Sequence, residues 1–295
     1  MPVSNTASTY TRSHFDAQDF LDLGLATKSS RVGWLNRLIG SANTRPLAPA
    51  SAGLAISSSM PLSLLGPAPV TNWSLDRFNL TIADAVWNDY NQAFLNMYDR
   101  NDGLRNAYVK GMSNEVNTFV KSQKSGGGQE TAAQSAVRLL SKPNGLNIAV
   151  IEITGWDSHV NILTNSGTNS ALSILNETLG TLSAGLKNYW KDTMIVVATE
   201  FGRTLKPNGA KGTDHGTGTI GFVIGGAING GRIVGSSMYP GLTNLGFDNA
   251  RDLKPLNDLR SFIRVPLQEM YKLTDNNFEK VLPGVKDVPP FNVMK

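Results

Sequence analysis

Two near-continuous apolar runs in the second half of the chain predict buried strands. Residues 146–153 (LNIAVIEI) and 194–198 (MIVVA) are hydrophobic at almost every position, as in strands that are covered on both faces of a sheet. The segment between them, 169–190, is predicted to be a helix. Strand, helix and strand in this order indicate a right-handed parallel crossover. The sequence therefore predicts an α/β fold with a mostly parallel sheet flanked by helices.

Apolar spacing and turn residues predict the remaining elements. Further helices are expected at 15–24, 81–98, 104–123, 129–141 and 257–272. A third strand at 220–224 leads to Asn229-Gly230, a hairpin signal, with a returning strand at 232–234. The stretch 41–75 is rich in Ser, Ala and Pro and predicts an irregular segment, with a short strand at 62–65 left open.

Composition excludes several classes of function. The chain has 27 basic and 23 acidic residues, a net charge of only +4, and its Lys and Arg residues are scattered. Binding to a phosphate backbone needs a concentrated basic surface, so nucleic acid is not an expected partner. No apolar run reaches the roughly eighteen residues of a membrane span. The absence of cysteine excludes disulfides, Cys-ligated zinc and thiol catalysis.

All three histidines lie within two residues of an aspartate. The segments are Ser13-His14-Phe15-Asp16, Asp157-Ser158-His159 and Asp214-His215. Imidazole and carboxylate together are the ligands that suit zinc, manganese and related divalent ions. The second segment follows the first buried strand, and Glu200 to Arg203 follow the second. Because ligands of open α/β sheets bind beyond the carboxyl ends of strands, we expect these groups to meet in one crevice.

Each of these pairs also has a purely structural interpretation. Asp157 and His159 could hydrogen-bond each other or cap the next helix, and Asp214-His215 could simply form a turn. Glu200 and Arg203 could be a surface ion pair worth under about 1 kcal/mol. Separate turns have no reason to place every histidine beside an acid, so metal binding or acid-base chemistry is the favoured hypothesis.

Ser13 has two readings that use the same geometry. As a helix N-cap it would form a capping box with Asp16. As a nucleophile, its hydroxyl would lie at a helix amino terminus, where the free amides stabilise negative charge. A divalent ion close by would lower the pKa of that hydroxyl.

Five segments, in order, resemble the successive signatures of the family called domain of unknown function 1501. They are RSHFDAQD at 12–19, GWLNR at 33–37, GWDSH at 155–159, EFGRT at 200–204 and GTDHG at 212–216. Asp258-Leu259-Arg260 resembles its carboxyl-terminal signature, so the match runs from residue 11 almost to the end. The family is similar to the alkaline phosphatase and sulfatase superfamily, in which one or two metal ions and a nucleophile at a helix amino terminus cleave phosphate or sulfate esters.

The resemblance implies a single domain over residues 1–295, folded as an alkaline phosphatase-like three-layer sandwich. Ser13 matches the nucleophile position. Asp157 and His159 match the metal ligands after a central strand, and Asp214 with His215 matches the late histidine ligand. Where the superfamily commonly has Asp-His after a strand, this chain has Glu200-Phe201, so Glu200 carries that metal position alone or the position is lost.

The amino terminus is where the chain departs from the family. Members normally begin with an export signal and a first strand ending in a Gly-Gly-x-Asp-Gly motif, whose aspartate resembles a metal ligand. Nothing before residue 11 matches that region, so we expect a bacterial family member that lacks its first strand. The family implies a periplasmic or secreted protein, whereas a chain complete as written would be cytoplasmic.

Three functions follow as hypotheses. In the first, the protein is a hydrolase of small phosphate or sulfate esters that depends on Zn, Mn or Mg. Ser13 attacks the ester, Arg203 holds its anionic group, and His14 is a ligand or donates to the substrate. The alternative is a non-catalytic secreted or envelope binding protein with a degenerate metal site. The third is metal-dependent hydrolysis of a different bond.

Overall fold

The fold is described from a computed structural model of the chain. It describes residues 11–42, 53–73, 84–100, 102–111, 130–142, 146–162, 170–235, 247–248 and 251–295. The chain divides into two units, one of residues 1–73 with 132–295 and one of residues 74–131. Each unit is described by itself.

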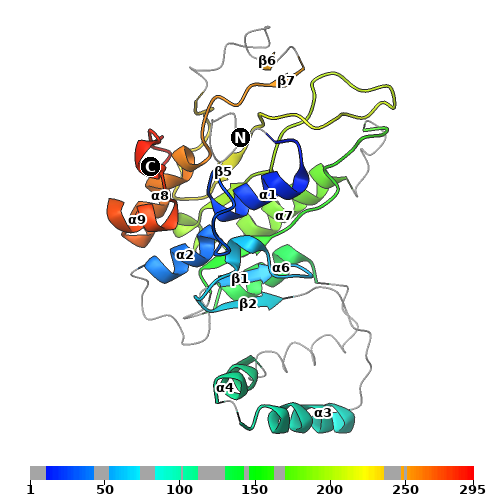
Figure 1. Ribbon diagram of the computed structural model, residues 1–295, viewed down its shortest axis with the longest axis vertical. Coiled ribbons are helices and arrows are strands. Elements are labelled where there is room, and N and C mark those ends of the chain that lie inside the picture. The colour runs from blue at the N-terminus through cyan, green and yellow to red at the C-terminus, as the bar shows by residue number, and fades with distance from the viewer. Residues whose placement is uncertain are drawn as a thin grey trace. The chain divides into compact units, whose positions relative to one another are not determined.

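A parallel sheet lies in the core of the larger unit. Strand β1 (Gly53–Ile56) is its centre, with β2 (Val70–Trp73) on one side and β3 (Ile148–Ile151) on the other. All four residues of β1 are buried, as expected for a strand that has neighbours on both edges. The helices α2 (Trp34–Ser41) and α6 (Ala132–Leu140) both contact β1 (Figure 1). The protein is therefore an α/β protein.

The segment 41–75 differs from its prediction. It supplies β1 and β2 instead of an irregular chain, and its apolar stretch 62–65 forms the 3-10 turn η2 (Leu62–Leu64) instead of a strand. The strand signal was hidden because β1 is only four residues long and two of them are Gly and Ala. Gly53 packs closely against its neighbours, since a Cβ there would lie 2.8 Å from Ile39 Cδ1 of α2 and 2.9 Å from Val70 Cγ1.

Parallel pairing between the two apolar runs is not found among the described residues. The second run forms β4 (Ile195–Val197), which pairs antiparallel with β5 (Phe222–Ile224). Within the described residues, β3 and β4 belong to separate ladders. The predicted return strand at 232–234 is wrong, because Ile228 forms its bridge with Met294 near the carboxyl terminus. The chain end thus occupies the place expected for a hairpin partner.

The predicted helices at 15–24, 169–190 and 257–272 correspond to α1 (His14–Leu23), α7 (Ala171–Gly185) and α8 (Arg260–Tyr271). The elements of the larger unit that were not predicted are η3 (Trp190–Asp192), β6 (Phe247–Asp248), β7 (Asp252–Leu253), α9 (Asp275–Val281) and η6 (Val285–Asp287). Helix α9 contacts α2 and α8, and Phe278, Val281 and Leu282 lie fully buried in the main core. The carboxyl-terminal helices therefore pack in the same hydrophobic core as the sheet.

The smaller unit contains α3 (Asp84–Met97) and α4 (Asp102–Gly111). The predicted helices at 81–98 and 104–123 fall here, although residues 112–129 lie outside the described part of the chain. Tyr108 donates a hydrogen bond from its hydroxyl to Asn91 Oδ1 at 2.5 Å, and its ring contacts Phe94 and Tyr98. Aromatic contacts thus join the two helices.

None of the described helices has the length and apolar character that a membrane crossing requires.

A buried polar network, which we call the Asn36–Arg37 network, ties α2 to its surroundings. Asn36 is 1% exposed, and its amide group donates to the carbonyls of Leu64 and Ala68 and accepts from the Ala68 amide. Arg37 donates to three carbonyl oxygens, those of Leu23, Val32 and Val281. Hydrogen bonds from the GWLNR segment therefore link α2 to the main chain of α1, η2 and α9.

Candidate metal centre

Helix α1 places Ser13 and His14 at its first turn. Ser13 is the N-cap residue with extended φ and ψ of -89° and 123°, but its side chain makes no capping hydrogen bond. The predicted capping box is wrong, because Lys28 Nζ lies 2.5 Å from Asp16 Oδ1 and 2.8 Å from Asp19 Oδ2. The hydroxyl of Ser13 is thus not used to cap the helix.

The loop that carries Asp214 and His215 folds back onto the segment after β3. Arg203 and His215 form a bridge, and so do Val160 and Lys211. Gly212 is needed for this approach, since a Cβ at that position would lie 2.0 Å from the His159 carbonyl carbon. The predicted meeting of the three sequence motifs therefore occurs through backbone contact as well as through side chains.

Asp157 lies at the centre of the resulting cluster. Its Oδ1 is 2.9 Å from His159 Nε2 and 3.0 Å from His215 Nε2. Its Oδ2 is 3.2 Å from His14 Nε2, and Arg203 Nη1 donates to Oδ1. All three histidines thus contact one carboxylate, which comes from a different segment than His14 and His215.

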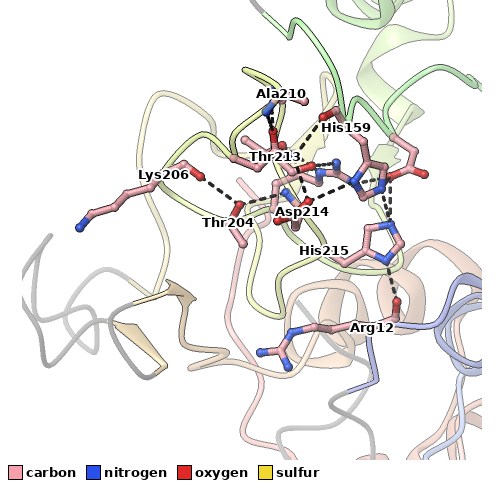
Figure 2. Close-up of polar contacts among 12 residues, drawn as sticks. Arg12, His159, Thr204, Lys206, Ala210, Thr213, Asp214 and His215 are labelled. Carbon is pink, nitrogen blue, oxygen red and sulfur yellow. Dashed lines mark hydrogen bonds and ion pairs between the residues drawn. The ribbon is translucent and has the colours of Figure 1, made fainter.

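Hydrogen bonds support the far side of two imidazole rings and fix the tautomer of one of them (Figure 2). His215 Nδ1 lies 2.7 Å from the carbonyl oxygen of Arg12, which is only an acceptor, so Nδ1 carries the proton. In the neutral His215 ring, Nε2 therefore carries the lone pair. His159 lies between two carboxylates, with Nδ1 3.3 Å from Asp214 Oδ1 and Nε2 2.9 Å from Asp157 Oδ1, so either of its nitrogens has an acceptor for the proton.

The Nε2 atoms of both rings face each other and face a carboxylate. They are 3.0 Å apart, and both are within 3.0 Å of Asp157 Oδ1. A proton on His159 Nε2 can join these atoms as hydrogen bonds, and a bound cation can take the place of that proton. Tetrahedral ligands bound about 2.05 Å from zinc are separated by about 3.3 Å, so a shift of a few tenths of an ångström fits an ion.

His14 and Glu200 extend the cluster on its other side. His14 Nδ1 lies 2.8 Å from Glu200 Oε1, and ligand atoms of His14, Asp157 and His215 all lie within 4.8 Å of one another. These three residues could hold a metal ion. Phe201, which follows Glu200, packs its ring against His14 and His215 at centroid distances of 4.9 and 4.6 Å.

Electrostatics keep the carboxylates charged. Burial raises the pKa of Asp157, but hydrogen bonds from Arg203, His215 and His14 outweigh it and lower that pKa to about 2. The Asn208 amide and then His159 lower the pKa of Asp214. The Glu200 hydrogen bond raises the pKa of His14 above its usual value. Asp157, Asp214 and Glu200 thus outnumber the one guanidinium of Arg203, which favours binding of a cation.

A comparison with models of known protein families identifies the family of this chain. The model of the family described as protein of unknown function (DUF1501) matches residues 8–282. The chain belongs to the DUF1501 family. No curated protein matches this DUF1501 sequence, and no solved structure matches its fold. The predicted family is therefore confirmed, and the function rests on the residues themselves.

The DUF1501 site brings together every residue that the sequence nominated for metal binding, together with His14 and Arg203. Ser13 directly precedes His14 in the chain. Arg203 donates one hydrogen bond from Nε to Thr213 Oγ1 at 3.0 Å and another from Nη2 to the Thr213 carbonyl oxygen. With the Asp157 contact, these bonds take three of its five N–H donors.

Two supporting residues of this DUF1501 protein were missed at the sequence level. Asn208 Nδ2 donates to Asp214 Oδ1 at 2.9 Å and to the His159 carbonyl at 3.0 Å. The Asn208-Gly209 pair signals a turn, but nothing local shows which carboxylate the amide reaches. Arg12 lies within the RSHFDAQD segment, yet its contribution is a main-chain carbonyl, which side-chain chemistry cannot reveal.

Proposed function

We propose that this protein is a metal-dependent hydrolase of small phosphate or sulfate esters with Ser13 as its nucleophile. The observation that carries the proposal is the convergence of the His159 and His215 Nε2 atoms on Asp157 Oδ1. Hydrogen bonds to the opposite ring nitrogens are the usual support of histidine ligands in metal sites.

The donor set suits Zn or Mn better than Mg. Imidazole nitrogens suit zinc and carboxylate oxygens suit manganese, whereas Mg prefers an octahedral set of oxygen ligands and retains its waters. Asp157, His159 and His215 would hold the ion, and His14, Glu200 and Asp214 lie next to them. A bound ion would supply Lewis-acid polarisation of the ester and lower the pKa of a nearby hydroxyl.

The chain's own residues have matching roles in the proposal. The Ser13 hydroxyl releases its proton to water, and its oxygen forms the new bond to phosphorus or sulfur while the bond to the leaving oxygen breaks. Water then cleaves the seryl ester, which releases phosphate or sulfate and restores the Ser13 hydroxyl. Amides at the start of α1 stabilise the anionic group, and the two remaining donors of Arg203 can hold it bidentately. His14, whose pKa is raised, donates a proton to the leaving oxygen.

The finer assignments of fold and location belong to the same proposal. An alkaline phosphatase-like three-layer sandwich is supported by the parallel order β2-β1-β3 and by helices that contact β1. A periplasmic or secreted location rests on the resemblance to exported family members. Fractionation of the native host with antibodies against the chain tests that location.

One set of measurements tests the enzyme. Purified protein is examined by elemental analysis, titrated with Zn²⁺, Mn²⁺ and Mg²⁺, and assayed with aryl phosphates and aryl sulfates. Ser13→Ala is expected to abolish turnover and to retain the metal. Ser170→Ala is the matched control, because Ser170 caps α7 through its side chain and its loss leaves turnover unchanged. Retained turnover in Ser13→Ala, with loss in Asp157→Ala, would contradict the covalent scheme and leave hydrolysis of another bond to be tested.

One contact favours the alternative, a non-catalytic binding protein with a degenerate site. Arg203 and His14 already donate to the two oxygens of Asp157, so protein groups occupy part of the carboxylate. In that case the purified chain contains no stoichiometric metal and shows no measurable affinity for the three ions. Such a result would replace the hydrolase proposal.

A further inference from the structure

Asp252 is a buried carboxylate that lies outside the cluster of candidate ligands. Its side chain has no exposed surface. Thr217 Oγ1 donates to its Oδ2 at 2.7 Å, and Arg12 Nη2 donates to its Oδ1 at 3.3 Å. A buried charge is tolerated only when it is paired. Arg251 Nη1 lies 3.7 Å from the same Oδ1, so Asp252 is compensated by two guanidinium groups and one hydroxyl and holds Arg12 as one of these partners.

Arg12 connects this buried carboxylate to the candidate metal centre. Its side chain pairs with Asp252, while its carbonyl oxygen accepts the Nδ1 proton of His215 at 2.7 Å (Figure 2). That hydrogen bond decides which nitrogen of His215 carries the lone pair. Arg12 also directly precedes Ser13 and His14. One ion pair thus fixes the main chain at the point where α1 begins and where His215 is oriented.

Asp252 also contacts the loop that carries His215. A Cβ at Gly216 would lie 2.9 Å from the Asp252 Cβ, and Thr204 forms a bridge with Asp252. Both the loop and the start of α1 are therefore anchored on the same residue. This common anchor sets the distance between the His215 ring and the carbonyl that orients it.

We propose that Asp252 is a positioning residue of the metal centre and acts through Arg12. It fixes the Nδ1–H tautomer of His215 and aligns Ser13 and His14 with the other ligands. The inference rests on the proposed metal-dependent function and assigns a role to a residue that touches no candidate ligand atom. Supporting residues of this kind typically change metal affinity about 10- to 100-fold.

The test compares Asp252→Asn with Asp258→Asn as a matched control. Asp258 forms a buried ion pair with Arg260 at 2.8 Å, and both side chains are 8% exposed. Co²⁺ serves as the probe, with its absorption spectrum reporting geometry and its titration reporting affinity. Nitrogen-15 spectra of the histidine rings report the His215 tautomer without any metal. Asp252→Asn is expected to weaken Co²⁺ binding about 10- to 100-fold and to alter the spectrum and the tautomer.

Arg12 variants provide a second test of the proposal if Asp252→Asn does not fold. Arg12 is 39% exposed, so Arg12→Gln should fold and show the same defects, while Arg12→Lys keeps the charge and restores part of the affinity. Unchanged Co²⁺ affinity, spectrum and tautomer in Asp252→Asn and Arg12→Gln would overturn the positioning role. If the wild-type chain bound no Co²⁺ or Zn²⁺, the metal function would fail, and the ring spectra would still decide whether Asp252 orients His215.

Discussion

The Asn36–Arg37 network and the candidate metal centre are two polar clusters that differ in burial and in the partners of their polar groups. In the first, every named contact joins an N–H donor to an oxygen acceptor, and Asn36 is 1% exposed. In the second, three histidines gather around one carboxylate, and the Asp157 side chain is 44% exposed. The first cluster is buried and its groups bond to main-chain atoms, whereas the second is open to solvent and its residues could hold a metal ion.

This difference separates two kinds of family signature that sequence alone presents as equivalent. The GWLNR segment and the GWDSH segment both combine Gly, Trp and polar residues. In the structure, the first satisfies backbone carbonyls and the second presents Asp157 and His159 to the other candidate ligands. Burial and the convergence of possible ligand atoms therefore distinguish a residue that stabilises the fold from a candidate metal ligand.

The largest expected effect comes from removing the charge at the centre. Asp157→Asn should lower Zn²⁺ affinity by more than about 100-fold, since it removes a ligand and its charge. The free energy of unfolding of the metal-free protein should change by less than about 1 kcal/mol, because this side chain is largely exposed. Calorimetric titration with Zn²⁺ and urea unfolding with chelator measure the two quantities. Severe destabilisation with intact Zn²⁺ affinity would reverse the roles of the two clusters.

The converse change is Asn36→Leu. It leaves the Leu64 carbonyl and the Ala68 amide and carbonyl without their partner. At about 1 to 3 kcal/mol for each buried group, the free energy of unfolding should fall by about 3 kcal/mol or more. Zn²⁺ affinity of the folded molecules should not change. The exposed Asn188→Leu is the control and should unfold at the wild-type urea concentration.

A smaller and pH-dependent effect is expected at Asp22. Burial raises the pKa of Asp22 from 3.8 to about 6, against the lowering effect of its Ser63 hydrogen bond. The folded state therefore binds the proton more tightly than the unfolded state, so ionisation destabilises the fold above pH 6 and not below pH 4. Asp22→Asn should stabilise the protein at pH 8 by at most about 3 kcal/mol, and the gain should vanish near pH 3.5. Urea unfolding at both pH values measures it, and an equal gain at both would exclude this cause.

The sequence predicted the parts of the fold that are set by local pattern. The end of α1 at Gly24 follows from the left-handed residue there, with φ of 63°, and the helices at 132–140 and 260–271 follow from apolar spacing. It did not predict β1, whose GLAI sequence is strand-like only because neighbours bury it on both edges. It also missed the antiparallel β4–β5 pair, because strand direction depends on where a long loop returns.

In the site, as in the fold, features that depend on neighbouring residues could be predicted and contacts between remote residues could not. Histidines beside acids at strand ends were sufficient to predict the convergence of His159 and His215 on Asp157. The contacts of Asn208 and Asp252 could not be predicted, because Asn208 reaches the His159 carbonyl 49 positions away and no local pattern shows that its amide turns toward Asp214. Asp252 is 240 positions from the Arg12 side chain that it holds.

The site is assembled from segments that are remote in the chain. His14 and Asp157 are 143 positions apart, and His215 is 203 positions from the Arg12 carbonyl that orients it. A bound ion would act as a reversible cross-link that closes these loops, and it would bind only the folded chain. Contacts over such long separations form late in folding. We therefore expect Zn²⁺ to slow the unfolding of the chain much more than it speeds refolding.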